Sequence, residues 1–174
     1  LVEGFGAQWL GIRALQGVDP DPGTFPGFSE ELRTAMDAEL RDLARRVLLE
    51  DRSMLEVLTA DERWLEPALA QHYGLSATDA GYHSVPGRSG AGLLTMAGFL
   101  TATSNPTRTS PVRRGKWVVS NVLCEEPPPP PDGVEQEIDE SGGEGSVREQ
   151  LEAHRADPSC AACHDQLDPV GLSL

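Results

Sequence analysis

Residues 160–164 combine the side chains of this chain that are best suited to chemistry. Cys160 and Cys163 are separated by two residues, and His164 follows directly. Two thiols at this spacing can each form a thioether bond to one vinyl group of the same porphyrin, and the adjacent imidazole can then ligate its iron. The motif therefore predicts covalent attachment of haem c, with His164 as the axial ligand of the iron.

Three other interpretations of the cysteine pair stay open. A thiol redox pair of the thioredoxin kind needs a βαβ setting, and no strand-rich segment precedes Cys160. A closed structural zinc site needs four ligands, and Cys124 is the only other cysteine. The third interpretation is a chance occurrence. We favour haem attachment over all three.

A ligating histidine usually donates its second ring N–H to an acceptor. The segment 168–171 follows His164 closely, and we expect the carbonyl of Pro169 to accept this bond, which places Pro169 in the cofactor site; a simple turn is the alternative. No Met or His follows His164, so the distal ligand stays open. The other Met and His residues are Met36, Met54, Met96, His72, His83 and His154, of which Met36 and Met54 are expected in the core.

The third cysteine, Cys124, is left over if the other two hold haem. A small buried apolar residue is the interpretation we favour, and a disulfide with a partner outside this segment is the alternative. A basic cluster, formed by Arg108, Arg113, Arg114 and Lys116, is expected to be a solvated helix start, with pairing to acidic groups as the alternative. The glycine-rich residues 87–92 lack the Gly-Lys-Ser/Thr ending of a phosphate loop and are expected to form a flexible loop.

Composition excludes several functions. The chain has 174 residues and a formal net charge of −14, which argues against a nucleic-acid surface. No apolar run reaches the length of a membrane span. With 39% apolar and 5% aromatic residues, we expect a core of Leu, Ala and Val. No signal peptide is recognisable, and we expect both ends to be cuts through a longer protein.

The elements that must position the motif are predicted to be helices. Ser29 is a candidate N-cap, and an apolar stripe from Leu32 to Leu48 follows it at helical spacing. Its other face carries Arg33, Asp37, Arg41 and Asp42 and is expected to be solvated. Further helices are expected in the N-terminal stretch 1–12 and at about 54–58, 60–65, 67–74, 93–103, 111–123 and 147–155, and residues 76–92 are expected to form a loop.

A change of composition after Cys124 marks a linker. Five consecutive prolines, residues 127–131, favour an extended segment, and eight acidic residues with no basic one lie between Glu125 and Ser146. We therefore expect an all-α protein with a multi-helix domain, a proline-rich acidic linker and the start of a cytochrome c-like haem-binding segment. The expected divisions are a helical domain at 1–80, a further helical segment at 81–124, the linker at 125–146 and the truncated haem-binding segment at 147–174.

The chain resembles the planctomycete cytochrome c-type multidomain proteins, in which two adjoining families of formerly unknown function occur. Three marks of the first lie at residues 8–11, 50–53 and 69–74, and marks of the second lie at 103–111, 114–117, 160–164 and 168–171. The family pattern often carries Met where this chain has Leu167. The resemblance implies a c-type haem, a bacterial extracytoplasmic setting and a chain that continues beyond Leu174.

Together these observations predict one-electron transfer through covalently attached haem. The partners are expected to be a redox protein or other domains of the same longer chain, with neither nucleic acid nor a membrane span. Two alternatives stay open: a haem enzyme of the di-haem peroxidase kind, which needs an open iron position, and a non-redox helical scaffold.

Overall fold

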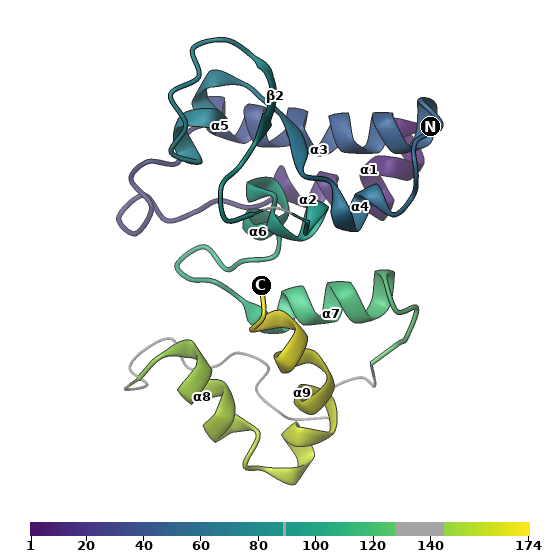
Figure 1. The fold of residues 1–174 in the computed structure, drawn as a ribbon. Coiled ribbons are helices and arrows are strands. Elements are labelled where there is room, and N and C mark those ends of the chain that lie inside the picture. The colour runs from purple at the N-terminus through teal and green to yellow at the C-terminus, as the bar shows by residue number, and fades with distance from the viewer. Residues whose placement is uncertain (89, 128–144) are drawn as a thin grey trace. The chain divides into compact units, whose positions relative to one another are not determined.

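The computed structural model describes residues 1–88, 90–127 and 145–174. The chain divides into two compact units, Leu1–Thr109 and Ser110–Leu174 (Figure 1). The first unit therefore includes residues 81–109, which the expected divisions placed in the segment 81–124, apart from residues 1–80. Most of the expected linker, residues 128–144, lies outside the described residues.

The first unit consists of short helical segments and two strands around one long helix, α3 (Glu30–Leu49). The other elements, in chain order, are η1 (Val2–Gly6), α1 (Ala7–Trp9), α2 (Ile12–Leu15), α4 (Glu56–Thr59), β1 (Glu62–Leu65), α5 (Pro67–His72), β2 (Gly81–Ser84), η2 (Gly92–Thr95) and α6 (Ala97–Ala102). Helix α3 contacts segments from both ends of the unit, including η1, β1, α5 and α6. It is therefore the central element of this core.

The predicted start and apolar face of α3 are confirmed. The Ser29 hydroxyl oxygen accepts a hydrogen bond from the backbone N–H of Leu32 at 3.1 Å, which satisfies one of the free donors at the helix start. The residues Leu32, Met36, Leu40, Leu43 and Val47 are buried.

The expectation of a solvated opposite face is wrong for Arg33 and Asp42. The Arg33 guanidinium donates to the carbonyl oxygen of Leu15 at 2.7 Å, and Asp42 forms an ion pair with Arg46 at 2.9 Å. Both side chains are buried: the partner of Arg33 comes from α2, and Asp42 accepts a further hydrogen bond from the Tyr82 hydroxyl at 3.0 Å in addition to its partner on the same helix.

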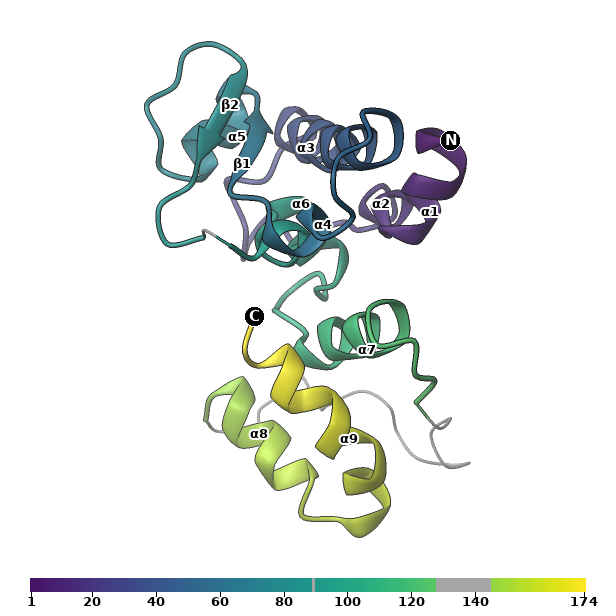
Figure 2. The same ribbon diagram turned by 45° about the vertical axis from the view of Figure 1, so that its right-hand side comes forward.

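The two strands correct the all-α prediction, since the chain is mostly helical but contains a two-stranded sheet (Figure 2). Strands β1 and β2 pair antiparallel, and Trp64 lies opposite Tyr82 with an edge-to-face ring contact at 5.4 Å between centroids. The expected helix at 60–65 is therefore wrong, and so is the loop over all of 76–92. Cross-strand aromatic pairs stabilise sheets. The two partners are far apart in the sequence, so a search for helical spacing does not detect the pair.

Two other predicted helices are interrupted. The N-terminal stretch breaks at Gly11, whose φ of 71° is left-handed. The stretch 93–103 forms η2 and α6, because the backbone of Met96 between them is extended. Met54 was expected in the core but is exposed, whereas Met36 and Met96 are buried.

The second unit contains α7 (Pro111–Asn121), α8 (Val147–His154) and α9 (Pro158–Gly171). Ser110 caps α7 as predicted, and Ser146 forms a capping box with Glu149 at the start of α8. Helix α7 packs against α9. In the described part of the chain, no helix has the length and apolar character needed to cross a bilayer.

Candidate functional site

The helix α9 carries the whole cysteine motif. Its start is defined by Asp157, whose carboxylate accepts the backbone N–H of Ser159 at 2.8 Å, and by Pro158 in the first turn, where a missing N–H is tolerated. Cys160, Cys163 and His164 then occupy positions i, i+3 and i+4, which share one face of a helix. The local sequence thus brings both thiols and the imidazole together.

The two thiols are partly exposed and form no disulfide. Among the residues that the structure describes, no three His, Cys, Asp or Glu side chains converge as metal ligands, so the geometry offers no closed zinc site. Cys124, which we expected to be buried, is exposed instead, with a positive φ of 56°. The buried apolar interpretation of this residue is therefore wrong.

The imidazole of His164 is held by a carboxylate. Its Nδ1 lies 3.0 Å from Oδ1 of Asp168, one helical turn later. An ionised carboxylate only accepts hydrogen bonds, so with Asp168 in this form Nδ1 is the donor and Nε2 is the ring nitrogen left to ligate a metal. We expected the Pro169 carbonyl in this position. The segment 168–171 continues α9 instead of forming a turn, and the Asp168 side chain is the group that reaches the ring.

The preceding helix, α8, supplies the neighbours of this pair. The His154 ring contacts the His164 ring edge to face, with 4.7 Å between centroids. Arg155 lies 3.8 Å from Asp168 and 3.8 Å from Asp165. The two histidine side chains of residues 110–174 therefore lie next to each other.

Two close approaches between helix backbones place α9 against α7. A Cβ atom on Gly115 of α7 would overlap the carbonyl oxygen of Leu167, and one on Gly171 would overlap the carbonyl oxygen of Pro111. Leu167 and Val119 are buried in the same unit. The side of α9 that carries Asp168 is therefore fixed by contacts that need glycine. Arg114, from the basic cluster, is also buried, so the expected solvated helix start is wrong for this residue.

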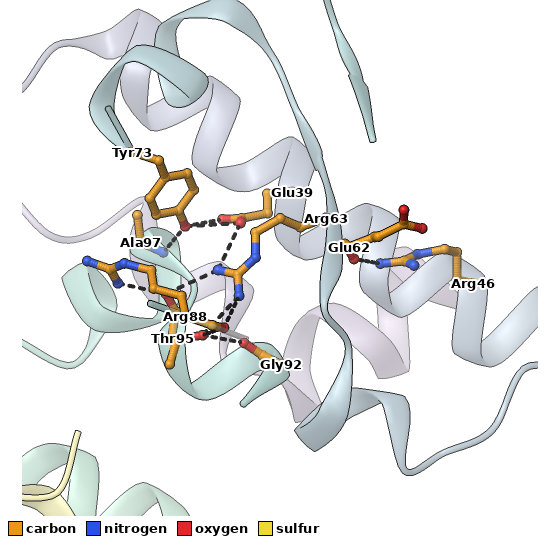
Figure 3. A network of polar contacts seen from close by, with 9 residues as sticks. All are labelled: Glu39, Arg46, Glu62, Arg63, Tyr73, Arg88, Gly92, Thr95 and Ala97. Carbon is orange, nitrogen blue, oxygen red and sulfur yellow. Dashed lines mark hydrogen bonds and ion pairs between the residues drawn. The ribbon is translucent and has the colours of Figure 1, made fainter. Parts of the chain in front are cut away.

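A second polar cluster, which we did not predict, lies in the first unit (Figure 3). The carboxylate of Glu39 lies 3.6 Å from the Arg63 guanidinium and accepts the Tyr73 hydroxyl at 3.0 Å. Arg63 also donates to the hydroxyl of Thr95 at 2.9 Å, and the Tyr73 oxygen accepts the backbone N–H of Ala97 at 2.7 Å. The cluster joins α3, β1 and α5 to η2 and α6.

This cluster is structural rather than catalytic in its geometry. Glu39 and Arg63 are each 1% exposed, which leaves them closed to a substrate. Burial raises the pKa of Glu39 to about 8, against the opposing charge of Arg63 and the Tyr73 hydrogen bond. Burial also raises the pKa of Tyr73, together with the neighbouring Glu39 charge. One sequence signal could have identified Glu39, since it lies within the apolar stripe between Met36 and Leu40.

Two family matches cover most of the chain. Residues 1–75 match PSD4, a protein of unknown function (DUF1592), and residues 90–174 match PSCyt3, a protein of unknown function (DUF1588). Two adjoining domains of unknown function are therefore present, as the sequence marks predicted. Neither a curated protein nor a solved structure matches the chain.

Proposed function

We propose that Cys160 and Cys163 attach haem c covalently, that His164 ligates its iron, and that the chain takes part in one-electron transfer outside the cytoplasm. The observation that carries this proposal is the arrangement on α9. Both thiols and the imidazole lie on one helical face, and the buried carboxylate of Asp168 engages Nδ1, which leaves Nε2 for the iron.

The donor set fits the group. Two thiols can form the thioether bonds, and a neutral imidazole with a bound Nδ1–H is the usual form of a histidine ligand. When bound, haem supplies the one-electron couple. The chain's own residues hold and orient it: Asp157 and Pro158 start the helix, the cysteines anchor the porphyrin edge, and Asp168 holds the ring of His164.

The cellular setting and the partners are part of the same proposal. The resemblance to cytochrome c-type multidomain proteins supports a bacterial extracytoplasmic location. The partners that we propose are a redox protein or other domains of the same longer chain. The basic side chains Arg113 and Lys116 are exposed on α7 in the second unit.

A haem enzyme is the second candidate. Residues 110–174 contain no methionine and only one further histidine, His154. That histidine lies beside His164 rather than across from it. This unit therefore supplies no Met or His for the sixth position, and an open position would permit reaction with peroxide or oxygen.

Expression of the chain together with the c-type maturation machinery tests the proposal. We expect a pyridine haemochrome spectrum with covalent haem at about one equivalent per chain, since the motif offers one pair of thiols and one imidazole. We expect Cys160→Ala and Cys163→Ala each to weaken or abolish covalent attachment, because each removes one thioether bond.

Cys124→Ala is the matched control, because it removes an exposed thiol outside the motif. We expect it to retain haem as the unsubstituted chain does. An unsubstituted chain without covalent haem would reject the proposal. Reactivity of the loaded chain with peroxide would favour the enzyme over a simple electron carrier.

A further inference from the structure

We propose that Asp168 is a positioning residue for His164: its carboxylate accepts Nδ1–H, selects the tautomer that leaves Nε2 for the iron, and makes the imidazole a more electron-donating ligand. This inference rests on the proposed function and deepens it, since it assigns to a side chain the hydrogen bond that a backbone carbonyl was expected to provide.

The geometry supports a specific contact. Nδ1 and Oδ1 are 3.0 Å apart, which is the length of a normal hydrogen bond. The side chain of Asp168 is 0% exposed, and that of His164 is 17% exposed. A bond closed off from water is not weakened by competing solvent, so its direction determines the orientation of the ring.

Stabilisation of the helix does not account for this pair. Asp168 lies in the last turn of α9, where the macrodipole disfavours a negative charge. The acidic residue also follows the histidine, and the opposite order is the better one for pairs four residues apart. Burial of a carboxylate adds a desolvation cost, which is tolerated where charged or hydrogen-bonding partners offset it.

The second carboxylate oxygen faces Arg155, the residue that follows α8. Oδ2 of Asp168 is buried without a hydrogen-bond partner, and the Arg155 guanidinium lies 3.8 Å from it. Arg155 also faces Asp165, and His154 faces the His164 ring. The carboxylate is thus placed between a cation on one oxygen and the imidazole N–H on the other. This arrangement resembles the carboxylate–histidine pairs that orient ligands in metal sites.

One consequence concerns the redox potential. A carboxylate that accepts the N–H of a histidine ligand increases the basicity of the ligating nitrogen. A more basic ligand favours the ferric over the ferrous iron and therefore lowers the midpoint potential. Asp168 would hence tune the potential as well as the ring orientation.

The experiment has one readout without haem and one with it. In the haem-free chain, the histidine tautomer is measured by long-range ¹H–¹⁵N correlation at alkaline pH, where the imidazole is neutral. We expect the Nδ1–H tautomer at His164 and its loss in Asp168→Ala. In the loaded chain, we expect Asp168→Asn, which keeps an acceptor oxygen but removes the charge, to shift the midpoint potential upward.

Asp165→Asn is the matched control. This substitution removes the same charge at the residue next to His164. Asp165 also faces Arg155, but its side chain is 71% exposed. His164 is paired with Asp168 and not with Asp165. We expect the tautomer and the potential to be unchanged. An Nδ1–H tautomer that survives Asp168→Ala, or equal potential shifts in Asp168→Asn and Asp165→Asn, would overturn the inference. An unsubstituted chain that never acquires haem overturns the proposed function instead. The tautomer of His164 is measured without haem, so it tests the role of Asp168 even if haem attachment fails.

Discussion

Individual charged residues in this protein are buried where side-chain type alone indicates exposure. Glu39 and Arg63 lie inside the first unit, and Asp168 lies inside the second. Each carries a partner from another part of the chain: Arg63 and Tyr73 for Glu39, and Arg155 for Asp168. An ionisable group buried without such a partner costs several kcal/mol whether it is charged or only polar, so the partners explain why these residues remain inside.

Glu39 makes the stability of the first unit depend on pH. Its pKa is raised from the usual 4.5 to about 8, so between these values the folded chain keeps a proton that the unfolded chain releases. The unfolded state is then favoured as pH rises, and the free energy of unfolding falls between about pH 5 and pH 8. One pKa unit corresponds to about 1.4 kcal/mol, so the fall reaches a few kcal/mol.

Chemical denaturation at the two ends of this pH range measures the effect. We expect Glu39→Gln to remove most of the pH dependence, because the glutamine does not titrate. Glu31→Gln on the exposed part of the same helix is the control and should behave as the unsubstituted chain. An unchanged pH dependence in Glu39→Gln would contradict the assignment of the proton to Glu39.

At the scale of elements, the contact between α7 and α9 decides whether the cysteine motif has a supporting surface. Gly115 and Gly171 allow the two helix backbones to touch, and both contacts lie next to the segment that carries Asp168. A side chain at either glycine would separate the helices. The position of α9 therefore depends on residues that carry no chemistry of their own.

Gly115→Ala tests this dependence. Its Cβ would overlap the Leu167 carbonyl, so we expect a loss of stability of about 1–3 kcal/mol in the second unit, the range usual for overpacking. Urea denaturation measures the loss, followed by the fluorescence of Trp117 on α7 in a chain whose other two tryptophans, Trp9 and Trp64, are replaced by phenylalanine. Ser120→Ala also places an alanine on α7, but on its exposed face, where the Cβ is already present and only a hydroxyl is lost, so it should leave the midpoint nearly unchanged. Equal midpoints for the two variants would show that the helices do not pack through Gly115.

At the scale of the whole molecule, the matched families and the compact units have different boundaries. The PSCyt3 match begins at residue 90, whereas the first unit continues to Thr109. Residues 90–109 supply the buried side chains Leu93, Met96 and Phe99 and two partners of the polar cluster, Thr95 and Ala97. The start of the second family segment thus completes the fold of the first.

Truncation separates these two boundaries. We expect a fragment of residues 1–109 to unfold cooperatively in urea, and a fragment of residues 1–75 to lack a cooperative transition. Each buried apolar side chain contributes about 1.5–3 kcal/mol, and the loss of three approaches the total stability of an ordinary domain. A fragment of residues 1–88 keeps both strands but lacks the same three side chains, and it should also fail. Cooperative unfolding of the shortest fragment would show that the first family segment folds alone.

The parts of this protein that were predictable from sequence are those that depend on local contacts. Ser29 and Ser110 start their helices through hydrogen bonds to residues three positions away, and the stripe of α3 follows helical spacing. The cysteine motif belongs to the same class, since one turn of α9 places its three side chains together. For these features the amino-acid sequence was sufficient.

The tertiary structure decided what depends on distant partners. Trp64 is in a strand because Tyr82 lies opposite it. Glu39 is buried because Arg63 and Tyr73 reach it. Arg155, from another segment, approaches the buried Asp168. Strand pairing and the burial of charge are favourable only when such partners arrive from elsewhere in the chain. The sequence by itself therefore determined the haem-binding chemistry that we propose, and only the fold showed that Asp168 is buried and faces Arg155 as well as His164.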